Sequence, residues 1–74
     1  MVFNACDPSG AGGLVADATA IASVGAHPLA VVTGAYVRDT AEVFDHHAFD
    51  EDAIAEQART ILEDVPVQVI KVGF

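Results

Sequence analysis

The chain has a single cysteine, no tryptophan and no long apolar run. Because Cys6 is the only cysteine, no disulfide can form within the chain, and this fits a reducing compartment. No stretch approaches the roughly 18 uninterrupted apolar residues that a membrane span needs. The N-terminus also lacks the cationic start of a signal peptide. We therefore expect a cytoplasmic protein with no membrane partner.

Positive charge is scarce as well. Lysine and arginine total 3 against 11 aspartates and glutamates, which gives a formal net charge of −8 at pH 7. Nucleic acids bind proteins largely through clustered Lys and Arg, so we expect no nucleic-acid partner. His46 and His47 lie beside Asp45, but adjacent side chains on an extended segment point in opposite directions, so we predict no metal site.

Apolar residues are abundant, and their spacing predicts alternating strands and helices. With 74 residues and 53% hydrophobic content, the chain can form at most one small domain. Gly25 is placed to end the first helix, and Asp50 is placed to cap the second. The predicted elements are a strand over 2–6, a helix over 14–24, a strand over 29–36, a short extended piece at 43–44, a helix after Asp50 and a strand over 67–74.

This order of elements predicts a three-layer α/β fold with a parallel sheet, because parallel strands need helical crossovers. The apolar run at 29–36 is typical of a strand that is covered on both faces. The last predicted strand ends at Phe74 and would leave a long apolar edge exposed. We therefore expect the chain to be the N-terminal portion of a larger α/β protein.

The segment CDPSGAGG, residues 6–13, follows the first predicted strand and opens a helix. Open α/β sheets bind ligands at this corner, and small residues let a ligand approach the backbone closely. The segment is not a Walker A loop, because no lysine precedes Lys71. It also fits the dinucleotide fingerprint poorly, since Gly10 and Gly12 match but Val15 stands at the third glycine position.

Two aspartates flank this loop and leave two interpretations open. A carboxylate beside a phosphate is repulsive without a metal, so Asp7 and Asp17 indicate a ligand that presents a hydroxyl or a ring amine. Alternatively, Asp7 is a turn or capping residue before Pro8, and Asp17 is a solvent-exposed residue stabilised by the helix dipole.

Three segments together carry a family resemblance: DPSGAGGLVAD (7–17), VVTGAYVRDT (31–40) and EQARTILEDVPVQVIKVGF (56–74). They resemble the N-terminal third of hydroxymethylpyrimidine and phosphomethylpyrimidine kinases, which belong to the ribokinase-like superfamily and act in thiamine biosynthesis. The resemblance implies that residues 1–74 are the N-terminal part of a single ribokinase-like kinase domain. It also implies ATP and magnesium as cofactors, a small pyrimidine substrate and a homodimer at full length.

The resemblance also implies a set of substrate-binding positions. Ala5 and Gly12 would line the pyrimidine pocket, Asp17 would contact the substrate, and Tyr36 and Phe74 would supply apolar walls. No catalytic residue is expected here, because the catalytic residue, the anion hole and most of the ATP site lie in the C-terminal half of family members. The 74 residues are thus expected to supply the substrate-binding half and to be inactive alone.

Arg38 is a departure from the family, which usually has glutamine at this position. Glutamine both donates and accepts hydrogen bonds, whereas arginine only donates. An aminopyrimidine needs an acceptor for its amino group, so either Asp39 turns inward to accept or the substrate differs. Alternatively, Arg38 is an exposed turn residue paired with Asp39.

Other functions remain open at this point. A related pyridoxal-type kinase would keep the scaffold and change the substrate. A non-catalytic pyrimidine-binding subunit is motivated by Arg38 and Val15. A fragment of a nucleotide-binding oxidoreductase is disfavoured because the third glycine of the dinucleotide fingerprint is missing.

Overall fold

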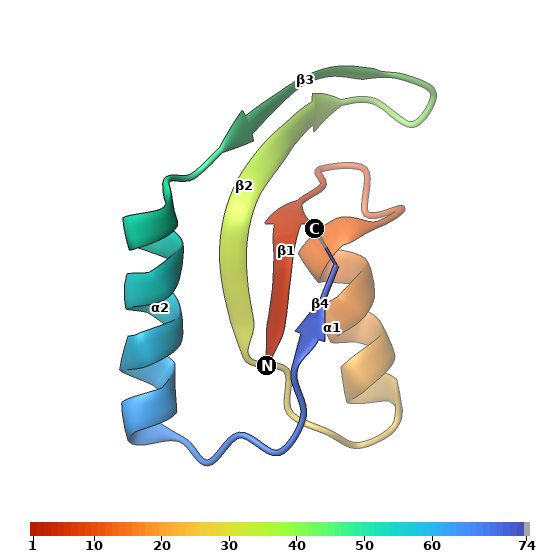
Figure 1. The fold of residues 1–74 in the computed structure, drawn as a ribbon. Coiled ribbons are helices and arrows are strands. Elements are labelled where there is room, and N and C mark those ends of the chain that lie inside the picture. The colour runs from red at the N-terminus through yellow and green to blue at the C-terminus, as the bar shows by residue number, and fades with distance from the viewer. Residues whose placement is uncertain (74) are drawn as a thin grey trace.

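The computed structural model describes residues 1–73, and Phe74, with its expected role as an apolar wall, lies outside them. Four strands form one sheet in the order β3-β2-β1-β4 (Figure 1). Along the chain, the elements are β1 (Val2–Cys6), α1 (Gly13–Ser23), β2 (Ala30–Arg38), β3 (Val43–Ala48), α2 (Glu51–Asp64) and β4 (Lys71–Val72).

The sheet is mixed rather than parallel. β1 pairs in parallel with β2 and with β4, whereas β3 runs antiparallel to β2. The predicted parallel sheet is therefore found for β1, β2 and β4, whereas β3 departs from it as an antiparallel strand and extends beyond the predicted piece at 43–44. The connection between β2 and β3 is short, and a short turn can join only antiparallel neighbours. Asp39 builds this turn, since its Oδ1 accepts from the backbone N–H groups of Ala41 and Glu42, each at 2.8 Å.

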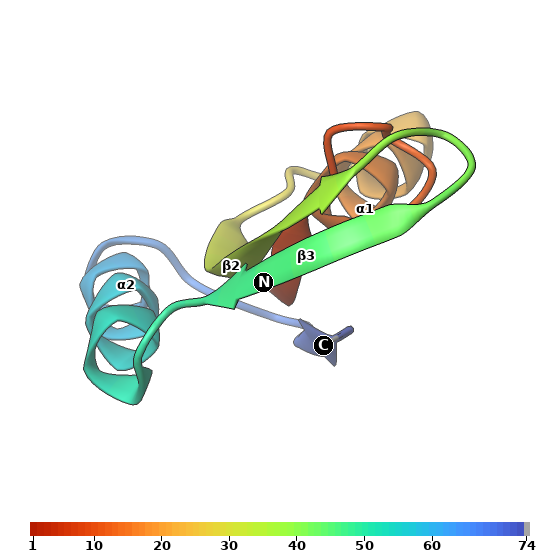
Figure 2. The ribbon, with the colours of Figure 1, turned by 90° about the horizontal axis from the view of Figure 1, so that it is seen from above.

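The two helices lie on opposite sides of the sheet, as the three-layer prediction requires (Figure 2). α1 packs over β1, and the buried apolar residues are Val2, Ala5, Leu14 and Val31. From β1 the chain crosses by α1 to β2, and later returns by α2 to β4 on the other side of β1. Right-handed crossovers in opposite directions place their helices on opposite faces. The α/β class with helices about one sheet is thus confirmed.

The helix ends follow the predicted signals. Gly25 has a φ of 81°, and its N–H donates to the Ala22 carbonyl at 3.0 Å just beyond the end of α1. Asp50 caps α2 by accepting from the Ala53 N–H at 2.7 Å. Glu51 and Asp52 occupy the first turn of α2, where the helix dipole favours negative charge.

Gln57 ties α2 to the sheet, although no residue of α2 is buried. Its Oε1 accepts from the Val32 N–H at 3.0 Å, and its Nε2 donates to the Val32 carbonyl at 2.8 Å. β3 pairs with β2 only from Gly34 onward, so the edge of β2 before Gly34 has no strand beside it. The side chain of Gln57 therefore completes this edge, which the sequence pattern did not reveal.

We expect Gln57→Leu to lower the free energy of unfolding by about 1–3 kcal/mol, because both backbone groups of Val32 lose their partner. Glu56→Leu, at the exposed neighbouring position, is the matched control and should change stability by less than about 0.5 kcal/mol. Urea denaturation of the two variants makes the comparison. Equal effects would contradict the assigned role of Gln57.

β4 is shorter than the predicted strand over 67–74. The register pairs Val2 with Lys71 and Phe3 with Val72, so residues 67–69 lie beyond the start of β1 and have no strand to pair with. The side chains of Val69, before β4, and Val72, within β4, are 73% and 72% exposed. Among residues 1–73, no helix is long and apolar enough to cross a membrane.

Candidate functional site

Asp7 organises the loop that follows β1. It is 4% exposed, and its carboxylate accepts from the Ser9 N–H at 2.9 Å, the Ser9 hydroxyl at 2.7 Å and the Gly12 N–H at 3.1 Å. The Asp7 carbonyl also accepts from the Gly10 N–H at 3.0 Å. This geometry is that of a turn residue, which is one of the two roles expected for Asp7. The carboxylate thus holds the loop in shape from within.

Gly13 allows the loop to pass close to β1. Its φ is 66°, and a Cβ at this position would lie 2.4 Å from the Ala5 carbonyl oxygen. The Ala5 side chain is fully buried beneath this crossing. Gly12 differs, since a Cβ there would lie 3.6 Å from Asp7 Oδ2, an ordinary contact. The tight approach therefore depends on Gly13 rather than on Gly12.

Arg38 connects the end of β2 to the loop. Its Nη1 lies 3.4 Å from Asp7 Oδ2, and its Nε donates to the Asp39 carbonyl oxygen at 3.0 Å. The Arg38 side chain is 21% exposed. The Asp39 Oδ1 accepts from the backbone of the β2–β3 turn instead, so the structure does not show the inward orientation that was one of the two alternatives for Asp39. The ion-pair partner of Arg38 is Asp7, across two neighbouring strand ends.

Asp17 lies in a second polar group, which joins α1 to β1 and β4. Its Oδ2 accepts from Asn4 Nδ2 at 2.8 Å, and its Oδ1 accepts from Lys71 Nζ at 2.5 Å. The side chain is 12% exposed, so Asp17 is not the solvent-exposed helix residue of the alternative interpretation. Sequence reasoning missed Asn4, although a single polar residue inside the apolar run VFNAC was a signal.

Tyr36 packs against His46 on the antiparallel pair β2–β3. The two residues are cross-strand partners, and their rings stack at 4.6 Å between centroids with an interplanar angle of 26°. Gly34 allows the strands to lie close, because a Cβ there would be 2.4 Å from the His47 carbonyl oxygen. Tyr36 therefore presents an aromatic surface next to the strand end that carries Arg38.

The structure brings only some of the predicted site residues together. The Gly12 N–H and the Arg38 guanidinium both contact Asp7 Oδ2, and Ala5 is buried below the loop. Asp17 belongs to the neighbouring group around Lys71. The two groups draw their cations from strands on either side of β1, Arg38 from β2 and Lys71 from β4. The candidate site is therefore this corner, at the carboxyl ends of β1 and β2.

Three carboxyl groups near the corner have lowered pKa values. The Ser9 hydroxyl is the main cause of the lowered pKa of Asp7, which the other loop N–H groups and Arg38 lower further. The Lys71 ammonium, followed by the Asn4 amide, lowers the pKa of Asp17. Hydrogen bonds from the backbone N–H groups of Glu42 and Ala41 lower the pKa of Asp39. All three groups are therefore anionic at neutral pH.

These pKa shifts predict how the free energy of unfolding depends on pH. A carboxyl whose pKa is lower in the folded state than in the unfolded state stabilises the fold at pH values above its unfolded pKa of about 3.9. This contribution is lost as the pH falls through the pKa of the folded state. We therefore expect the free energy of unfolding to decrease below about pH 4. Asp17→Asn should reduce the slope of this decrease in urea titrations from pH 2 to 6. An unchanged slope would contradict the pKa assignment.

The residues present do not fit ATP or magnesium. Phosphate binding requires clustered cations or a nest of N–H groups, but Arg38 and Lys71 are each paired with an aspartate. Arg59 lies exposed on α2. No group of three or more His, Cys, Asp or Glu residues within 1–73 is placed to hold a metal ion. No step involving a nucleotide is therefore assigned to these residues.

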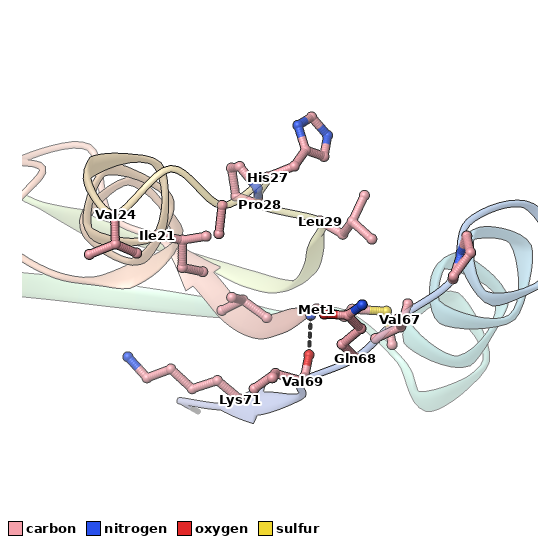
Figure 3. Close-up of a pocket in the computed structure, with 13 residues that line it drawn as sticks. Met1, Ile21, Val24, His27, Pro28, Leu29, Val67, Gln68, Val69 and Lys71 are labelled. Atoms are coloured by element: carbon pink, nitrogen blue, oxygen red, sulfur yellow. Dashed lines mark hydrogen bonds between the residues drawn. The ribbon is translucent and has the colours of Figure 1, made fainter.

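An apolar cavity of about 570 Å³ lies at the other end of the sheet (Figure 3). It is formed where the chain enters β1, β2 and β4, and the N-terminal amine of Met1 donates to the Val69 carbonyl beside it. None of the predicted site residues within 1–73 lines it. Its lining consists of Met1, Val2, Ile21, Val24, Ala26, His27, Pro28, Leu29, Pro66, Val67, Gln68, Val69 and Lys71.

Comparison with known proteins identifies relatives of this chain. It is 39% identical over 68 residues to a probable chloroplastic thiamine biosynthetic bifunctional enzyme of Oryza sativa, covering 92% of this chain and 12% of that protein. It is 31% identical over 68 residues to a hydroxymethylpyrimidine/phosphomethylpyrimidine kinase of Aquifex aeolicus, covering 92% of this chain and 27% of the relative. The chain thus spans about a quarter or less of the length of these two relatives.

A crystal structure of phosphomethylpyrimidine kinase from Clostridium difficile superimposes with a TM-score of 0.92 at 26% identity, over 99% of this chain and 32% of that one. The sheet order, the loop after β1 and this structural similarity define the class of the chain as a ribokinase-like α/β fold. The model of the family described as phosphomethylpyrimidine kinase matches residues 7–74, and the chain belongs to this family.

Proposed function

We propose that the protein containing this chain uses ATP and magnesium to phosphorylate hydroxymethylpyrimidine and its monophosphate in thiamine biosynthesis. Residues 1–74 are then the N-terminal part of a single ribokinase-like kinase domain. They supply the substrate-binding half and are inactive alone, because residues 1–73 contain no cluster of cations for a γ-phosphate: Arg38 and Lys71 are each paired with an aspartate. The main support is the loop after β1, whose shape Asp7 maintains by hydrogen bonds and whose residues 10–13 are all glycine or alanine.

In this proposal the pyrimidine ring lies against the loop, with Gly12 and the buried Ala5 beneath it. Tyr36 supplies an aromatic wall, and Phe74 supplies a second apolar one. The Asp17 carboxylate accepts a hydrogen bond from the amino or hydroxyl group of the substrate. A flat ring bound by stacking surface and a few directed polar groups is the usual composition of such a site.

The chemistry of the Arg38 side chain limits which atoms of the ring this side chain can contact. Within residues 1–73, its acceptors are Asp7 and the Asp39 carbonyl, and other guanidinium N–H groups have no protein acceptor there. These groups can donate to a ring nitrogen but cannot accept from an exocyclic amine. Since Asp39 Oδ1 accepts both backbone hydrogen bonds of its turn, we assign Asp17 as the acceptor for the amine.

The same observation favours a second candidate, a related pyridoxal-type kinase. A donor-only residue suits a ring that presents acceptors at this position. A coupled ATPase assay of the full-length gene product with hydroxymethylpyrimidine, its monophosphate and pyridoxal distinguishes the candidates. Turnover of the two pyrimidines supports the proposal, whereas turnover of pyridoxal alone overturns it. Tight pyrimidine binding without turnover, measured by calorimetry, would instead indicate a non-catalytic binding subunit.

We propose the cytoplasm as the location, since the single cysteine fits a reducing compartment. A homodimer is the proposed assembly at full length, on the basis of the family resemblance. Sedimentation of the full-length gene product tests the assembly, and a monomer at micromolar concentration would contradict it.

A further inference from the structure

The Asp17 carboxylate is held by side chains from two strands that are far from it in the sequence. Asn4 on β1 donates to one oxygen, and Lys71 on β4 donates to the other. Three elements of the fold therefore meet at one carboxylate. Each carboxylate oxygen can accept more than one hydrogen bond, so both retain capacity for a ligand.

Burial is unequal within this group. The Asp17 side chain is 12% exposed, whereas the Lys71 side chain is 60% exposed. A carboxylate that has lost most of its water needs hydrogen bonds to replace it, and the two donors provide them. An ammonium that keeps most of its hydration adds little to stability. Lys71 therefore contributes more to the orientation of Asp17 than to the stability of the fold.

The orientation of Asn4 is fixed as well. Its Oδ1 accepts from the Ala5 N–H at 2.8 Å, which leaves its Nδ2 directed to Asp17. Gly73, directly after β4, lies so close that a Cβ there would be 2.4 Å from Asn4 Nδ2. Glycine at this position lets the chain after β4 pass beside Asn4. The position of β4 against β1 is thus linked to the geometry of Asp17.

We propose that Lys71 is a positioning residue for the candidate site, holding the Asp17 carboxylate from β4 so that it accepts a hydrogen bond from the substrate. This inference rests on the proposed function, in which Asp17 contacts the pyrimidine. Within residues 1–73, the charged group that acts on Asp17 from the packed strands is Lys71, since Asn4 on β1 is neutral. The lowered pKa of Asp17 is consistent with this arrangement.

Kinetics of the full-length gene product test the positioning role of Lys71. Lys71→Met should raise KM for hydroxymethylpyrimidine about tenfold with kcat nearly unchanged, because an oriented substrate contact is lost. The acidic limb of the kcat/KM profile should move to higher pH. Lys71→Arg should restore most of the affinity. Arg59→Met, which removes an exposed cation from α2, is the matched control and should leave both constants unchanged.

A carbon-13 NMR titration of the Asp17 carboxyl gives a second readout that needs no turnover. Its pKa should rise in Lys71→Met and stay low in Arg59→Met. A lowered Tm with unchanged KM and unchanged Asp17 pKa would overturn the inference and leave Lys71 a structural role alone. If the unaltered protein phosphorylates no pyrimidine, the proposed function fails, and the NMR titration still decides whether Lys71 governs Asp17.

Discussion

Gly13→Ala is expected to lower the free energy of unfolding by about 2–4 kcal/mol. Two costs combine at this position. Alanine is disfavoured at a φ of 66°, and its Cβ would lie 2.4 Å from the Ala5 carbonyl oxygen, which is backbone and cannot move aside alone. The loop would have to lift from β1, and the start of α1 with it. Thermal and urea unfolding measure the loss directly.

Gly25→Ala is the matched control for this variant. Gly25 has a φ of 81°, but a Cβ there meets nothing within 4 Å. It therefore carries only the cost of the left-handed conformation, about 1–2 kcal/mol. The difference between the variants measures the close approach of the loop to β1. If Gly25→Ala is as harmful as Gly13→Ala, the close approach does not limit the fold.

Asp7→Asn should disorder the loop, with the second largest effect. The carboxylate accepts from Ser9, from the Gly12 N–H and from Arg38, so both of its oxygens act as acceptors. An asparagine amide replaces one acceptor oxygen by an NH₂ donor, which then faces another donor. We expect a lower Tm, faster hydrogen exchange at the Ser9 and Gly12 N–H groups, and weaker pyrimidine binding by the full-length gene product.

Asp39→Asn is the comparison for Asp7→Asn. Asp39 also accepts two backbone hydrogen bonds in a turn, but it is exposed and lies outside the loop. Asparagine suits such turns, so little change in Tm is expected. Exchange at Gly12 should also stay slow in this variant. Rapid exchange at Gly12 in both variants would mean that Asp7 has no special role in shaping the loop.

Local signals made much of the fold predictable from the sequence. Gly25 and Asp50 marked helix ends because a left-handed residue and a side-chain cap act within one turn. β3 was less predictable, since its pairing depends on the Asp39 turn and on the close approach at Gly34. The short β4 depended on register against β1, which a sequence pattern does not contain.

The candidate site was predictable in position but not in its contacts. The glycine-rich segment after a strand pointed to the correct kind of corner, because a strand end and a helix start are sequence-local features. The partners were not local. Asp7 meets Arg38 across 31 positions, and Asp17 meets Lys71 across 54. Such pairs depend on which strands become neighbours, so spacing alone favoured Asp39 as the partner of Arg38.

The central claim is that the pyrimidine binds at the loop after β1, and a nitrogen-15 NMR titration of the full-length gene product with hydroxymethylpyrimidine tests it most directly. We predict saturable shifts at the Gly12 and Gly13 N–H groups and at the Arg38 side chain. Shifts confined to residues around the apolar cavity at the other end of the sheet, such as Val24, Leu29 and Val69, would contradict the claim.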